Sequence, residues 1–148
     1  MNKKILIING PNLNLLGDRE PEVYGNETLD DIKNLCEKKG KDLSLDIDFT
    51  QSNDEGEIVE SIQNAKKKFS GIIINAGALT HTSISILDAL LSTKLPIIEV
   101  HLSNIFTREA FRKESFVSKA AKGIICGFGS KSYDLALEAI STLLKEKN

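Results

Sequence analysis

Cysteine is scarce in this chain, and features that would direct a protein to a membrane or out of the cell are missing. Its 148 residues include only Cys36 and Cys126, which form no recognisable disulfide framework. The sequence opens with no charged-then-apolar leader, and it has no apolar run near the roughly 20 residues of a membrane-spanning helix. We therefore expect a cytoplasmic protein with reduced thiols.

An excess of positive charge is also missing. The formal net charge is -2 and the isoelectric point is near 5.7. Nucleic-acid phosphates and anionic lipids are bound by clustered lysine and arginine, so the composition favours neither as a partner. Small molecules or other proteins are the expected partners.

The pattern of apolar segments indicates one α/β domain spanning residues 1–148, with no repeat, low-complexity tract or linker. Short β-branched runs predict strands at residues 3–9, 43–49, 71–76, 96–102 and 123–128. Longer stretches between them predict helices near residues 28–39, 55–68, 83–93, 108–120 and 131–146. This alternation predicts right-handed crossovers and a parallel sheet covered by helices on both faces.

Chemically useful side chains follow the first, third and fourth predicted strands. In such a sheet, ligands bind at the carboxyl ends of the strands, near the switch in strand order. The polar residues at these ends are Asn9, Asn12, Asn75, His81, Glu99, His101, Ser103 and Asn104. Both histidines of the chain are among them.

The spacing of Glu99 and His101 favours an oriented imidazole. At a period of two, both side chains point to the same side of the strand, so the carboxylate can hold one ring nitrogen while the other faces the cleft. Such an imidazole suits proton donation. The alternatives are that each histidine caps or covers the surface and that Glu99 only solvates the strand end.

A long first connection, residues 9–26, shows no clear periodicity and exceeds the usual length of structureless loops. It contains Tyr24 and Arg19. A tyrosine base near neutral pH needs its pKa lowered by about 3 units from ~10. A guanidinium nearby can supply about 1 to 3 of these. The loop is thus either a lid carrying a base and its activator, or an ordinary surface loop.

Four motifs carry a resemblance to a known family. They are INGPNLNLLGDREPEVYG (8–25), NAGALTHTS (75–83), EVHLSN (99–104) and REAFR (108–112). Together they resemble the motif set of type II 3-dehydroquinate dehydratase, from end to end of the chain. The resemblance implies a flavodoxin-like three-layer sandwich with a five-stranded parallel sheet, assembled as a homododecamer built from trimers.

The implied activity is a lyase reaction of the shikimate pathway towards chorismate and the aromatic amino acids. Water is lost from 3-dehydroquinate by trans elimination through an enolate, giving 3-dehydroshikimate. By resemblance, Tyr24 is the base, Arg19 lowers its pKa, His101 is the general acid and Asn12 holds a water against the enolate. Whether the enzyme works in biosynthesis or in quinate breakdown stays open.

The resemblance also implies the substrate contacts. The ring hydroxyls are bound by Asn75, His81 and Arg112, and the carboxylate by the backbone amides of Leu102 and Ser103. Asp88 reaches the site of a neighbouring subunit. On the predicted helix 83–93, this aspartate lies at the edge of an apolar face formed by Ile84, Leu87 and Leu91.

The residues agree with this chemistry without a cofactor. Elimination beside a ketone needs a base, an acid and a stabiliser of the enolate oxygen. Two histidines twenty residues apart are a poor zinc set, and nothing requires a lysine Schiff base. A helix starting near residue 105 would offer N–H groups to an anion. On it, Arg108 and Arg112 would share one face, which leaves open whether Arg108 faces the cleft or solvent.

Two alternatives share the expected fold. A nucleotide- or flavin-binding module would want the G-x-G-x-x-G spacing, which GPNLNLLG lacks. A phospho-receiver domain would want an acidic cluster after the first strand, where this chain has Asn9 and Asn12.

Overall fold

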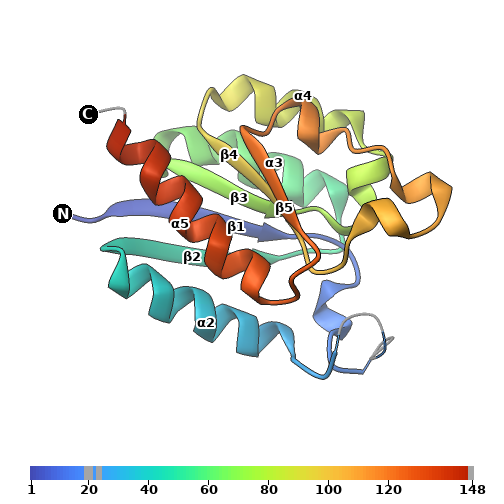
Figure 1. Cartoon of the computed structure of the whole chain (residues 1–148). Coiled ribbons are helices and arrows are strands. Elements are labelled where there is room, and N and C mark those ends of the chain that lie inside the picture. Colours follow the sequence, from blue (N-terminus) through green and yellow to red (C-terminus); the bar gives the residue numbers. More distant parts are fainter. Residues whose placement is uncertain (19–21, 23–24, 147–148) are drawn as a thin grey trace.

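A computed structural model describes residues 1–18, 22 and 25–146 of the chain. Its sheet is parallel throughout and has the strand order β2-β1-β3-β4-β5 (Figure 1). The strands are β1 (Lys3–Asn9), β2 (Leu45–Gln51), β3 (Gly71–Asn75), β4 (Ile97–His101) and β5 (Gly123–Cys126). The longer helices are α2 (Leu29–Asp42), α3 (Glu55–Lys68), α4 (Ile84–Thr93) and α5 (Lys131–Glu146). The predicted α/β architecture is confirmed.

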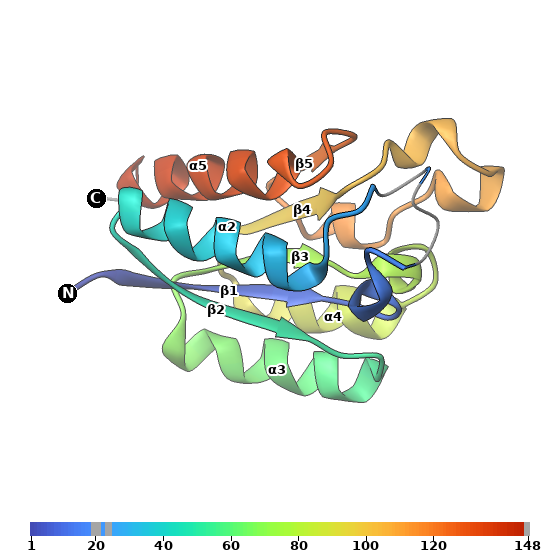
Figure 2. The same cartoon turned by 90° about the horizontal axis from the view of Figure 1, so that it is seen from below.

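The sheet has a hydrophobic core on each face. Figure 2 shows α2 and α5 on one side of the sheet and α3 and α4 on the other. Successive residues of β1 alternate between them: Ile5 and Ile7 pack towards α2 and α5, whereas Leu6 and Ile8 pack towards α3 and α4. This alternation is the period of two that a strand imposes on its side chains. Strands buried on both faces therefore need the continuous apolar runs seen in the sequence.

Local caps set where the helices begin. Thr28 and Asp31 form a reciprocal capping box at α2, and Asp54 and Ser83 accept hydrogen bonds from backbone N–H groups at the starts of α3 and α4. The predicted bounds 55–68 and 131–146 agree with α3 and α5. The predicted strand 43–49 is shifted, because α2 continues to Asp42 and Ser44 turns the chain with a φ of 57°.

The predicted helix at 108–120 is wrong. The chain there forms short 3-10 turns: η3 (Ile105–Thr107), η4 (Ala110–Arg112) and η5 (Val117–Lys119). Within these turns only Ile105 and Val117 are buried, so the segment has no continuous apolar stripe to hold a helix against the core. Arg108 and Arg112 consequently do not share a helical face.

Helix α4 packs against the core with residues other than Ile84, Leu87 and Leu91. Its buried side is formed by Ile86, Ala89, Leu90 and Thr93. The predicted apolar face points outward, with Ile84 and Leu91 exposed over 57% and 54% of their surfaces. The helix is therefore apolar on two sides, and only one of them packs against the described part of the chain.

Candidate active site

A cavity of about 220 Å³ lies at the carboxyl ends of the central strands. β1 and β3 are neighbours in the sheet, but the chain runs from β1 to the edge strand β2 and from β3 through β4 to the opposite edge strand β5. The carboxyl ends of β1 and β3 therefore form the topological switch point, where ligands bind in such folds. The cavity is lined by the predicted residues Asn12, Asn75, His81, His101, Leu102, Ser103 and Arg112, and also by Arg108. The structure thus brings together residues that are distant in the sequence.

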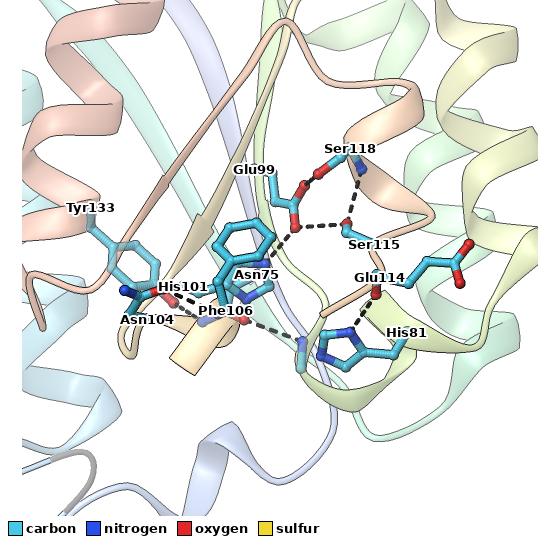
Figure 3. Close-up of polar contacts among 11 residues, drawn as sticks. Asn75, His81, Glu99, His101, Asn104, Phe106, Glu114, Ser115, Ser118 and Tyr133 are labelled. Carbon is cyan, nitrogen blue, oxygen red and sulfur yellow. Dashed lines mark hydrogen bonds and ion pairs between the residues drawn. The ribbon is translucent and has the colours of Figure 1, made fainter. Parts of the chain in front are cut away.

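Glu99 and His101 form a buried carboxylate–imidazole pair in the site (Figure 3). Nε2 of His101 lies 2.5 Å from Oε2 of Glu99, as the period of two predicted. Since a carboxylate only accepts, Nε2 carries the proton of this hydrogen bond. Within the described part of the chain, no hydrogen bond engages Nδ1, the ring nitrogen left for the cavity.

The Glu99 carboxylate has further donors. The hydroxyl of Ser115 donates to Oε2 at 2.8 Å, and the hydroxyl of Ser118 donates to Oε1. Burial opposes ionisation of Glu99, but the hydrogen bond and charge of His101 and the two hydroxyls outweigh it, so the pKa of Glu99 lies below its ordinary value. Glu99 therefore stands behind His101 as an ionised orienting group and does not line the cavity.

His81 presents a second imidazole beside the first. The two rings stack with centroids 6.5 Å apart and planes 17° apart. Nδ1 of His81 donates to the carbonyl oxygen of Glu114 at 2.7 Å. Burial lowers the pKa of His81, and the neighbouring His101 and Arg112 act in the same direction. When neutral, the two histidines thus hold their protons on opposite ring nitrogens.

Asn75 is held from behind by Tyr133. Its Nδ2 donates to the tyrosine oxygen at 3.0 Å, and its Oδ1 accepts from the N–H of Gly77 at 3.2 Å. The Tyr133 hydroxyl in turn donates to Oδ1 of Asn9 at 2.6 Å. In the sequence, Tyr133 belongs to the apolar stripe of α5. The one signal of its polar role is its hydroxyl group among hydrocarbon side chains.

A close approach between β1 and β3 shapes the loop that carries Asn12. The N–H of Gly10 donates to the carbonyl of Asn75 at 2.8 Å, and a Cβ at position 10 would lie 2.2 Å from the Ala76 oxygen. Only glycine fits there. Asn12 follows with a φ of 70°, and its N–H donates to Oδ1 of Asn53 at 3.0 Å. Asn12 is thus fixed at the cavity by its own backbone.

The two arginines give the cavity positive charge. Nε of Arg112 donates to Oε1 of Glu109 at 3.1 Å, and a nitrogen of Arg108 donates to the Ser103 hydroxyl at 3.4 Å. Both side chains are mostly buried beside the cavity. Arg108 follows the C-terminal end of η3 and lines the cavity, so it faces the cleft and not the solvent. Such a cavity suits an anionic ligand.

Other predicted site residues lie elsewhere. Asp88 is exposed on the outward side of α4 and does not line the cavity. Arg19 and Tyr24 lie outside the described residues. Over the described ranges, no group of three or more His, Cys, Asp or Glu side chains could hold a metal ion. None of the described helices has the length and apolar character needed to cross a bilayer.

Comparisons with known proteins agree with the motif resemblance. The Dehydroquinase class II family model matches residues 3–141. The chain is 60% identical to the 3-dehydroquinate dehydratase of Prochlorococcus marinus subsp. pastoris, over 97% of this chain and 99% of that protein. It is 51% identical to the enzyme of that name from Phenylobacterium zucineum, covering 98% and 100% of the two chains.

Solved structures show the same relationship. The type II dehydroquinase of Butyrivibrio crossotus superimposes with a TM-score of 0.92 at 43% identity, covering 94% of this chain and 97% of the other. That of Propionibacterium acnes gives a TM-score of 0.92 at 43% identity, covering 96% and 98%. The expected three-layer fold and the resemblance are both confirmed. This chain belongs to the class II dehydroquinase family.

Proposed function

We propose that residues 1–148 form one catalytic domain that removes water from 3-dehydroquinate to give 3-dehydroshikimate, a lyase step of the shikimate pathway in the cytoplasm. The observation that carries the proposal is the Glu99–His101 pair, bonded at 2.5 Å beside a cavity lined by two arginines. Family membership and the names of the relatives support this reaction over a nucleotide-binding module or a phospho-receiver domain.

An anionic substrate fits the charge of the cavity. Arg108 and Arg112 line it, and the chain after β4 continues through Leu102 and Ser103 along its wall. We assign the substrate carboxylate to the backbone amides of Leu102 and Ser103. The ring hydroxyls are assigned to Asn75, His81 and Arg112, whose positions on the wall support hydrogen bonds to a polar ring.

His101 is the proposed general acid. Its Nε2–H donates the hydrogen bond to Glu99, so the proton for the leaving hydroxyl comes from Nδ1 of the imidazolium. As the C–O bond breaks, its electron pair takes up that proton and water departs. The ring returns to the neutral form with its proton on Nε2. The ionised Glu99 stabilises the imidazolium and keeps the ring oriented.

Tyr24 is the proposed base, activated by Arg19. In a trans elimination, it takes a proton from the carbon beside the ketone, and Asn12 holds a water against the resulting enolate oxygen. The other tyrosine is unsuited to this task. Burial raises the pKa of Tyr133, whose hydroxyl is already bonded to Asn9 and Asn75. These steps require no cofactor.

A homododecamer built from trimers completes the proposal. The outward side of α4 exposes Ile84 and Leu91 with Asp88 between them, and an apolar surface of this kind suits contact with another subunit. Asp88 would then contribute to the substrate site of its neighbour, because it lies away from the cavity of its own chain.

The test is direct. Purified protein is mixed with 3-dehydroquinate, and the ultraviolet absorbance of the conjugated product is followed, with His101→Ala as the matched variant. We expect a rise for the wild type and a rise slower by at least a hundredfold for the variant. Folded wild-type protein, verified by circular dichroism, that gives no rise would overturn the proposed function.

A further inference from the structure

One segment of the chain, residues 113–119, holds both imidazoles of the site (Figure 3). Its Glu114 carbonyl accepts from His81, and its Ser115 and Ser118 hydroxyls donate to Glu99, the partner of His101. We propose that Ser115 and Ser118 are positioning residues, which hold the Glu99 carboxylate in the orientation that lets His101 act as the acid. The inference rests on the proposed function.

The hydrogen bonds of Glu99 support this role. The carboxylate is fully buried, where an ionised group is costly unless it is paired and hydrogen-bonded. His101 and Ser115 donate to Oε2, and Ser118 donates to Oε1. Both oxygens are therefore engaged, from different directions. This arrangement opposes rotation of the carboxylate and, through the 2.5 Å hydrogen bond, fixes the ring of His101 with Nδ1 left for the cavity.

The segment that carries the serines is itself anchored. Val117, between them, is fully buried in the core beneath α3 and α4. The N–H of Phe116 donates to the Thr80 carbonyl at 2.9 Å, which ties the segment to the 3-10 turn η2 (Gly77–His81). Because these contacts do not involve either hydroxyl, the backbone of the segment has support that is independent of Glu99.

The two serines are not equivalent as experimental targets. Ser115 also accepts a hydrogen bond of 3.0 Å from the N–H of Ser118, so its truncation would disturb the turn. The Ser118 hydroxyl makes its hydrogen bond to Glu99, and the residue is otherwise exposed. Ser118→Ala therefore removes one donor to the carboxylate, and Ser118→Thr keeps a hydroxyl donor at this exposed position.

Loss of the donor also has a direction in pH. The Ser118 hydroxyl helps to lower the pKa of Glu99, so Ser118→Ala should raise that pKa. The carboxylate is ionised above its pKa, and the acid limb of the kcat profile should therefore move to higher pH. Among the described residues, the charged groups beside the pair are His81 from η2 and the cavity-lining Arg112 and Arg108, and none of them is changed by the substitution.

The kinetic experiment compares wild type, Ser118→Ala, Ser118→Thr and the control Ser141→Ala. Ser141 is a buried serine of α5 that lies outside the cavity lining. We expect Ser118→Ala to lower kcat about tenfold with little change in KM, because the acid and not substrate binding is affected. Ser118→Thr should restore kcat, and Ser141→Ala should retain it.

A second readout does not depend on turnover. Magic-angle-spinning NMR of ring-¹⁵N histidine distinguishes protonated from unprotonated ring nitrogens, and the chain has only two histidines. When both rings are neutral, wild type should show the proton of His81 on Nδ1 and that of His101 on Nε2, with His81→Asn assigning the signals. Ser118→Ala should shift the Nε2 resonance of His101 and leave the His81 resonances in place.

The outcomes separate the two proposals. Wild-type kcat, pH profile and His101 resonances in Ser118→Ala would overturn the positioning role. An equal loss of kcat in Ser141→Ala would also overturn it, since any buried serine would then have the same effect. If the wild type fails to turn over 3-dehydroquinate, the proposed function is contradicted, and the NMR comparison still decides whether Ser118 controls the His101 ring.

Discussion

The hydroxyl of Tyr133 donates a hydrogen bond of 2.6 Å to Oδ1 of Asn9 across 124 positions of the sequence. The hydroxyl oxygen of Tyr133 accepts a hydrogen bond from Nδ2 of Asn75 at 3.0 Å. One side chain of α5 therefore ties together the ends of β1 and β3, directly beneath the cavity. This buried polar link stabilises the point at which the two strands deliver Asn12 and Asn75 to the site.

Tyr133→Phe should destabilise the fold by about 1–3 kcal/mol, because Asn9 and Asn75 each lose a partner in the core. Urea unfolding measures the loss. Asn9→Leu provides the other single variant of a double-mutant cycle, in which the combined variant should lose less than the sum of the two. Additive losses would contradict the coupling.

Stability should depend on pH through His81. Burial lowers its folded pKa from the ordinary value of 6.5, so the folded state binds fewer protons than the unfolded state between the two values. The free energy of unfolding should therefore fall as the pH drops from about 6.5 to the folded pKa of His81. Below that folded pKa, His81 should cause no further fall. His81→Asn should flatten that part of the curve in urea titrations at several pH values. An unchanged curve in the variant would assign the dependence to another group.

Tyr24→Phe should abolish turnover with little loss of binding, because only the proposed base hydroxyl is removed. Calorimetric titration with a non-reacting substrate analogue measures binding, and product absorbance measures turnover. Arg19→Ala should instead slow catalysis and move the acid limb of the pH profile to higher pH, because the tyrosinate loses its counter-charge and the pKa of the base rises. Near-normal turnover in Tyr24→Phe would mean that another group is the base.

His101→Ala should lower kcat by a factor on the order of 10² to 10⁴, as expected on loss of a general acid. Glu99→Gln should also lower kcat. An amide lacks the negative charge that stabilises the imidazolium, and its NH₂ group cannot accept a hydrogen bond as the second carboxylate oxygen does. Borohydride treatment in the presence of substrate should leave the wild type active. Inactivation would indicate a Schiff base and a different mechanism.

Mixed assemblies should reveal whether each site uses two chains. Tyr24→Phe and Asp88→Ala proteins are first shown to be nearly inactive alone, then mixed under conditions of subunit exchange. Activity should return, because some sites combine the intact Tyr24 of one chain with the intact Asp88 of another. Demonstrated exchange without recovered activity would place Asp88 within its own site or only in folding.

Much of the fold was predictable because its signals are local. The apolar period predicted α3 and α5 to the residue, and β-branched runs located the strands. The meeting of His81 and His101 was predictable from a general rule, since carboxyl ends of parallel strands share an edge. The Glu99–His101 contact followed from a period of two within one strand.

The remaining features were decided only by tertiary structure. The sequence did not reveal that segment 108–120 would form turns and bring Arg108 to the cavity, or that Ser115 and Ser118 would donate to Glu99. Nor did it show which apolar side of α4 would face outward. Each of these depends on contacts between segments that are distant in the chain. A local pattern specifies which side chains share a face, whereas the neighbour that covers that face is selected by the packing of the whole fold.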